Sequence, residues 1–147
     1  MIHLRTEPFE PGALLTAFCQ GRSETGAVVS FTGLARGGHG AVQRLELEAY
    51  PGFTEAEIGR IAEAARGRFA LHDLMIVHRI GQIAPGEAIV FVAAAAAHRR
   101  AAFEAADCLM DYLKSRAPFW KKEHGLDGAR WIEPSERDLT DAARWDG

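Results

Sequence analysis

The stretch Asp111–Glu123, with the sequence DYLKSRAPFWKKE, decides how the C-terminal part of the chain folds. It continues a helical pattern before Pro118 and changes to a strand pattern after it, because proline disfavours helical geometry in the preceding residue. The bend can bring Lys114, in the last helical turn, close to Lys121 on the strand. An ammonium beside apolar surface and a second cation has a lowered pKa, which makes it a better nucleophile or base.

A purely structural interpretation of this block also stays open. Cations in the last turn of a helix complement the negative end of its dipole. Lys-Lys-Glu on a strand is a common solvated surface. The block alone therefore does not decide between a lysine-based site and an ordinary surface.

The helix that ends in this block begins at His98-Arg99-Arg100, after an apolar strand over Ala88–Ala95 that is expected to be central and covered on both faces. Cations at a helix N-terminus oppose its dipole, while the free amides there can bind an anion. These side chains are therefore either candidates for an anion site or exposed residues tolerated at a small cost. At 1.5 Å per residue the helix is about 25 Å long. One small ligand can contact both ends only at a bend or across a subunit interface. The helical spacing predicts an inward stripe of Phe103, Ala106, Met110 and Leu113.

The remaining elements follow from alternation, helical spacing and turn residues. The strand over Ala27–Gly33 is expected to be buried and to form an antiparallel hairpin with the strand over Val42–Tyr50. Arg36, in the glycine-rich loop between them, is a candidate ligand-binding residue. Two further strands are expected over Ile2–Thr6 and Asp73–Ile80, with a turn over residues 81–86 after the second. Two helices are expected, one from Pro11 and one opened by a capping box at Thr54–Glu57. A hairpin turn at Asp127-Gly128 returns through Ala129–Ile132, and a charged tail over 134–147 contains a short helix.

Composition limits the class of protein. The chain has 147 residues, is 48% hydrophobic, and shows no repeat or linker, which predicts one α+β domain over 1–147. The net charge of -3 gives no global attraction to nucleic acid or an anionic membrane. No secretory signal and no apolar stretch of about 20 residues is present, so a cytoplasmic protein is expected. Cys108 is expected to be a buried free thiol and His78 a strand side chain without metal-ligand spacing.

Five blocks of sequence, in order, resemble the large, catalytic subunits of molybdopterin synthase. The similarity runs over most of the chain, and the block around the two lysines is long and unusual in composition. The blocks are Gly26–Gly33 with Arg36, Leu47–Gly52, His78–Gly81, Ala97–Arg99 and Met110–Glu123.

The resemblance implies an α/β-hammerhead-like single domain with a mixed, mainly antiparallel sheet, packed helices and a C-terminal β-hairpin. It implies a homodimer that forms a heterotetramer with two small ubiquitin-like sulfur-carrier subunits. Each carrier ends in Gly-Gly and delivers sulfur as a thiocarboxylate. Two sulfurs are transferred to cyclic pyranopterin monophosphate to give molybdopterin, in molybdenum cofactor biosynthesis. No cofactor or metal is implied.

The resemblance also assigns roles. Lys114 matches the lysine regarded as essential and Lys121 the second active-site lysine, so both are expected to be catalytic and to bind substrate. The other expected substrate-binding positions are Arg36, His98, Arg99, Lys122 and Glu123. Leu34 stands where some relatives carry a lysine, which leaves the contribution of the short loop after it open.

Two other functions remain open from the residues alone. A lysine enzyme that forms a Schiff base with a carbonyl substrate needs the same desolvated lysine. A non-catalytic module could bind a ubiquitin-like tail or an anionic ligand.

Overall fold

The first of two sheets is built around the apolar strand β6. The computed structural model describes residues 1–146, and its first sheet has the order β1 (Ile2–Arg5), β4 (Asp73–Arg79), β6 (Ala88–Ala96) and β2 (Ala27–Leu34). β1 is parallel to β4, and the other neighbours are antiparallel.

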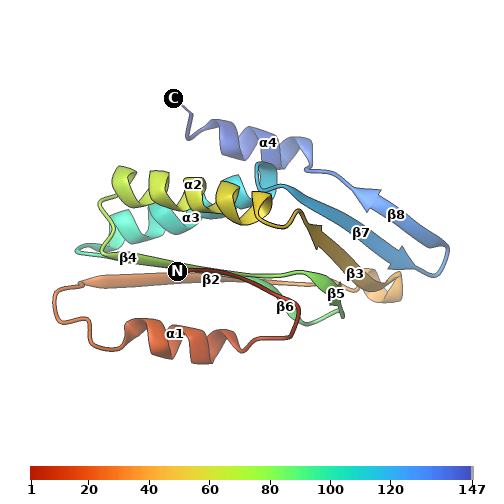
Figure 1. The fold of residues 1–147 in the computed structure, drawn as a ribbon, viewed down its shortest axis with the longest axis horizontal. Coiled ribbons are helices and arrows are strands. Elements are labelled where there is room, and N and C mark those ends of the chain that lie inside the picture. The colour runs from red at the N-terminus through yellow and green to blue at the C-terminus, as the bar shows by residue number, and fades with distance from the viewer. Residues whose placement is uncertain (147) are drawn as a thin grey trace.

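Helices cover both faces of this sheet (Figure 1). α2 (Phe53–Arg68) and α3 (Arg99–Ser115) pack on one face, over Leu74, Ile76 and Val92. α1 (Pro11–Cys19) covers the other face, where Phe18 packs on the opposite side chains of β4 and β6. The prediction that the strand from Ala88 is central and covered on both faces is confirmed.

The second sheet is antiparallel throughout and contains the C-terminal hairpin. Its order is β5 (Gly81–Ile83), β3 (Val42–Ala49), β7 (Phe119–Gly125) and β8 (Gly128–Ile132). A small core of Ala35, Leu45, Leu47 and Ile83 lies beneath it. A single 3-10 turn (Gly38–Gly40) precedes β3, and α4 (Glu136–Ala143) follows β8 and packs on α3.

The chain passes from one sheet to the other between β4 and β5. Gly81 has a φ of +83°, which a side chain with a Cβ rarely adopts, so glycine permits the change of direction. Arg79 is buried here, and its Nη2 donates a hydrogen bond to the Gln82 carbonyl at 2.7 Å. The sequence predicted only a turn over residues 81–86 and missed β5.

The predicted α+β class, the mainly antiparallel pairing and the C-terminal hairpin are confirmed, although the strands divide into two sheets. The predicted hairpin between β2 and β3 is wrong, since β2 pairs with β6 and β3 with β5 and β7. The predicted burial of β2 is also wrong, because it is an edge strand and Phe31 is 43% exposed.

Two local predictions about the helices need correction. Gly52, not Thr54, is the N-cap of α2, and no side chain caps this helix end. Phe103 is exposed on α3, whose buried residues are Ala102, Ala105, Ala106, Cys108, Leu109 and Leu113. Across residues 1–146, no helix is long and apolar enough to cross a membrane.

Candidate active site

A pocket of about 370 Å³ lies where the C-terminal end of α3 meets β7, the edge strand β2 and the C-terminal segment before α4. This size is in the range of small-molecule sites. Its walls are largely apolar, and its charged side chains are three cations and two carboxylates. The residues used below that line it are Phe31, Leu34, Arg36, His78, Met110, Leu113, Lys114, Phe119, Lys121, Glu133 and Asp138.

Lys114 and Lys121 reach this pocket from two different elements. Lys114 lies in the last turn of α3, and Lys121 lies on β7. The segment between them is held by buried Thr54, whose Oγ1 accepts a hydrogen bond from the Tyr50 amide and donates one to the Pro118 carbonyl, both at 2.8 Å. The predicted convergence of the two lysines is therefore seen in the structure.

The environments of the two lysines differ. Lys114 is exposed, whereas Lys121 is half-buried. Burial lowers the pKa of Lys121 below its usual value, and the positive charge of Lys114 lowers it further. Glu123 and Asp138 act in the opposite direction. Lys121 is thus the ammonium that gives up its proton more readily than an ordinary lysine.

His78 contributes a neutral imidazole to the same pocket. It lies on β4, is 7% exposed, and stacks on Phe119 with ring centroids 4.3 Å apart. Burial lowers its pKa to about 4, and the charges of Lys121 and Lys114 also lower it. The predicted packing of His78 as a strand side chain is confirmed, but the sequence did not place it beside the lysines.

The mouth of the pocket carries charges of both signs. Arg36 is exposed in the loop after β2. This loop is fixed by hydrogen bonds of Ala35 with Glu87 and Gly86. Glu133 and Asp138 line the same pocket, and the Asp138 carboxylate accepts a hydrogen bond from the Ser135 amide as part of a capping box.

The other predicted site residues lie outside this pocket within one chain. His98 is the N-cap of α3, and Arg99 begins it. Arg99 and Lys114 are 15 residues apart, which is about 22 Å along a helix axis. The opposite face of β7 carries Lys122, whose Nζ lies 4.9 Å from the centroid of the Trp131 ring.

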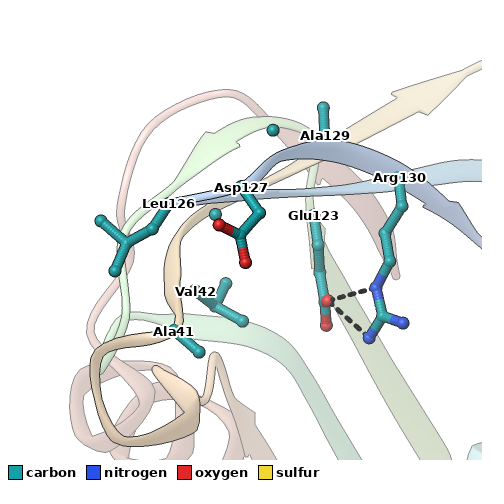
Figure 2. A pocket seen from close by; sticks show the side chains of 9 residues that line it. Ala41, Val42, Glu123, Leu126, Asp127, Ala129 and Arg130 are labelled. Atoms are coloured by element: carbon teal, nitrogen blue, oxygen red, sulfur yellow. Dashed lines mark hydrogen bonds and ion pairs between the residues drawn. The ribbon is translucent and has the colours of Figure 1, made fainter.

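Glu123 lines a second cavity of about 380 Å³ at the hairpin tip (Figure 2). Its carboxylate is paired with Arg130, whose Nε donates to Oε2 at 3.1 Å. The remaining lining comes from Ala41, Val42 and residues 125–129. This cavity therefore has no free cation among its lining residues and does not match an anionic ligand.

Sequence reasoning missed several residues of the lysine pocket. His78, Phe119 and Met110 line it, as do Glu133 and Asp138 from the C-terminal segment. The period-two alternation of β4 already placed His78 on the same face as Ile76. No local signal connects β4 to β7, because the two strands belong to different sheets.

The fold and the pocket together define an α+β protein of net charge -3 with a pocket in which two lysines and one arginine outnumber two carboxylates. Such a site suits a small anionic ligand or an anionic chain terminus. Within residues 1–146, no group of three or more His, Cys, Asp or Glu side chains is arranged to hold a metal ion.

The particular family follows from comparison with known proteins. The family model described as MoaE protein matches residues 4–116, which is most of the chain. The chain therefore belongs to the MoaE family, an enzyme family of molybdenum cofactor biosynthesis. The predicted family is confirmed.

Individual relatives agree with this assignment. The chain is 70% identical over 146 residues to the molybdopterin synthase catalytic subunit of Caulobacter vibrioides, covering 99% of this chain and 97% of that protein. It is 49% identical over 126 residues to the subunit of the same name from Escherichia coli, with 84% of each covered. The solved MoaE protein of Burkholderia ambifaria has a TM-score of 0.85 at 40% identity, covering 100% of this chain and 98% of that one.

Proposed function

We propose that this chain transfers sulfur from the thiocarboxylated C-terminus of a small ubiquitin-like carrier to cyclic pyranopterin monophosphate, giving molybdopterin after two transfers. The observation that carries the proposal is the convergence of Lys114 and Lys121 in one pocket, with the pKa of Lys121 lowered. Membership of the MoaE family supports it.

The charges of the pocket fit both reactants. A cyclic phosphate and a thiocarboxylate are anions, while the chain as a whole carries a net charge of -3. Arg36, at the pocket mouth, has the planar guanidinium that binds two phosphate oxygens at once. Lys114 acts as proton donor or acceptor beside the thiocarboxylate carbon, and Lys121 is the second catalytic lysine.

A small carrier subunit is the proposed protein partner. A solved structure from Helicobacter pylori, described as a complex of subunits 1 and 2 of molybdopterin-converting factor, has the same fold, with a TM-score of 0.75 at 20% identity, covering 92% of this chain and 91% of that one. In the present chain the open side of the pocket is bordered by exposed Leu34 and Phe31. These side chains offer apolar surface on which the extended Gly-Gly tail can lie.

A homodimer is the proposed core of the assembly, with one carrier bound to each subunit. His98 and Arg99 are too far from Lys114 to share a small ligand within one chain, and a partner subunit can supply them. The proposed location is the cytoplasm, because a thiocarboxylate donor and the free thiols Cys19 and Cys108 suit a reducing compartment.

The test combines purified chain, thiocarboxylated carrier and cyclic pyranopterin monophosphate, and follows the dithiolene product. Replacing Lys114 by Ala is expected to lower kcat by about 100-fold or more, the usual scale for loss of a general acid or base. Carrier binding should be retained. Arg60→Ala is the matched control, since it removes an exposed cation of α2 whose one ion-pair partner within residues 1–146 is Glu57.

Three outcomes contradict the proposal in different ways. Near-normal turnover by the Lys114→Ala variant would show that this lysine is not catalytic. No product from a folded, carrier-binding wild type would favour a binding module. The lowered pKa of Lys121 also suits Schiff-base chemistry, so trapping of a substrate adduct by borohydride would favour that class of enzyme.

A further inference from the structure

His78 lies where the core between the sheet and its helices opens into the lysine pocket. Leu74, Ile76 and His78 alternate on one face of β4, and the first two belong to the core under α2 and α3. His78 lines the pocket instead. A buried polar ring at this place needs a reason beyond packing, because an apolar side chain would fill the same space without desolvation.

The hydrogen bonding of His78 fixes which ring nitrogen carries the proton. Its Nδ1 lies 2.8 Å from the Arg79 carbonyl oxygen, which can only accept a hydrogen bond. Nδ1 therefore donates, and in the neutral ring Nε2 has a free lone pair. Stacking on Phe119, with 23° between the ring planes, holds the orientation of the ring.

The charges that act on this ring are those of the two lysines, while Glu123, Asp138 and Arg36 act on Lys121. Lys121, from β7, and Lys114, from α3, both act on the titration of His78, with Lys121 the stronger of the two. Lys121 follows Phe119 by two residues, so both side chains lie on one face of β7, and Phe119 is the residue stacked on His78. Lys121 is half-buried and Lys114 exposed, so Lys121 has the greater need of a fixed acceptor.

Among the described residues, Nε2 has no hydrogen-bond partner in the structure. We propose that His78 is a positioning residue whose Nε2 becomes the acceptor for the Lys121 ammonium when that side chain turns toward it, and thereby directs that lysine toward the reactants. The inference rests on the proposed function, in which Lys121 is catalytic. Acceptance of this hydrogen bond stabilises the protonated amine, in opposition to burial and to the charge of Lys114. Lys121 thereby keeps a proton that it can donate, without any proton transfer to the imidazole.

Three substitutions separate this role from packing. Gln at position 78 can place an amide oxygen near the position of Nε2. Asn reaches only the position of Nδ1. Phe keeps a ring for stacking and removes the acceptor. The variant His78→Gln therefore keeps a hydrogen-bond acceptor in the pocket, whereas His78→Asn and His78→Phe remove it.

The deciding measurement is the pKa of Lys121, obtained from the pH dependence of acetylation by acetic anhydride and read by mass spectrometry. Lys114, Lys121 and Lys122 are the three lysines of the chain, so Lys122 on the opposite face serves as an internal reference. The Asn and Phe variants should lower the pKa of Lys121 by about one unit, the scale of a lost hydrogen bond to a charged group, and Gln should restore it. An unchanged pKa in the Phe variant would overturn the proposal.

A second measurement needs no variant. In wild-type protein labelled with ¹⁵N-histidine, the Nε2 of His78 should give the chemical shift of an unprotonated, hydrogen-bonded nitrogen at neutral pH, and a protonated Nε2 would overturn the proposal even if every variant failed to fold. Acetylation and NMR need no turnover, so an inactive wild type would contradict the proposed function and leave this inference to its own tests. Where turnover is present, kcat is expected to fall about tenfold in the Phe variant with KM for the carrier unchanged.

Discussion

Lys121 and Lys122 are adjacent in the sequence and lie on opposite faces of β7. Lys121 lines the pocket, while Lys122 packs over Trp131. Replacing Lys121 by Ala is expected to lower kcat by about 100-fold or more, and replacing Lys122 by Ala to cost less than about tenfold. Steady-state kinetics with saturating carrier checks this. Equal losses would show that the assembled enzyme brings Lys122 to the reactants as well.

His78 makes folding stability depend on pH in a defined window. Its pKa is lowered to about 4 in the folded chain, against about 6.5 in an unfolded one. Its contribution is complete above pH 6.5 and is lost as the pH falls toward 4, because only the unfolded chain binds the proton there. Relative to the His78→Gln variant, wild type should lose about 3 kcal/mol across this window.

Urea unfolding of both proteins at several pH values measures this difference. The carboxylates are common to both chains, so their titration cancels in the comparison. Parallel pH profiles for the two proteins would contradict the lowered pKa.

Thr54 fits a helix-capping pattern in the sequence but has a different role in the structure. Thr54 to Glu57 fits a capping box, yet Thr54 is completely buried and hydrogen-bonds Tyr50 and Pro118 instead. Thr54→Val keeps the shape and leaves both backbone groups unpaired, which is expected to cost about 1–3 kcal/mol of unfolding free energy. Thr54→Ser should cost less. Chemical denaturation measures both, and equal losses would mean that the methyl group contributes as much to stability as the hydroxyl.

At the scale of elements, the Asp111 carboxylate on α3 binds the two residues that directly follow α4, the first of which is its C-cap. Asp111 Oδ2 accepts hydrogen bonds from Trp145 Nε1 at 2.6 Å and Arg144 Nη2 at 2.8 Å. Asp111→Ala leaves a half-buried indole donor unpaired and should lower stability by about 1–2 kcal/mol. For a chain of this size that is about 3–6 °C in Tm.

Asp107→Ala is the matched control for this prediction. Asp107 also pairs with Arg144, at 2.8 Å, but its side chain is 52% exposed. An exposed pair of this kind contributes less than about 1 kcal/mol. A calorimetric scan in which the control lowers Tm as much as Asp111→Ala would contradict the role assigned to Asp111.

The elements that the sequence predicted well are those with local signals. Pro11, the spacing of Ile58, Ile61 and Ala65, and the Asp127-Gly128 turn each determine structure within a few residues. Strand pairing depends on distant partners, and alternation in β2 and β3 contains no information about which strand lies beside them. β5 is three residues long, too short for a pattern to be visible.

At the scale of the whole molecule, the sequence predicted that Lys114 and Lys121 lie close together, but it did not predict how the other residues are placed around them. Pro118 marks the bend between α3 and β7, and Lys114 and Lys121, on either side of it, line the same pocket. To predict that His78 lines the same pocket, one would have to know how the two sheets lie relative to each other, because His78 is on β4 and Lys121 is on β7. A helix of 17 residues separates Arg99 and His98 from Lys114 and the pocket, and under the proposal above a second chain supplies them.

A hybrid dimer tests the proposal of a shared pocket. One chain carries Arg99→Ala and the other Lys114→Ala, with different tags for purification. Each parent homodimer should be inactive, whereas the hybrid keeps one intact pocket and should regain about half of the wild-type activity. Turnover assays on the purified hybrid measure this, and a hybrid as inactive as its parents would place both residues in a site within one chain.

The two cysteines of the chain differ in a way that has a practical consequence. Cys19, at the end of α1, is exposed, whereas Cys108 on α3 is buried and its pKa is raised to about 11 by that burial. Thiol reagents react with the thiolate, so Cys108 is protected at neutral pH. A maleimide dye added to the folded chain should therefore attach at α1, on the face of the first sheet opposite α3 (Figure 1). The natural sequence thus provides a single attachment point from which fluorescence energy transfer can time the arrival of a labelled carrier without mutating the enzyme.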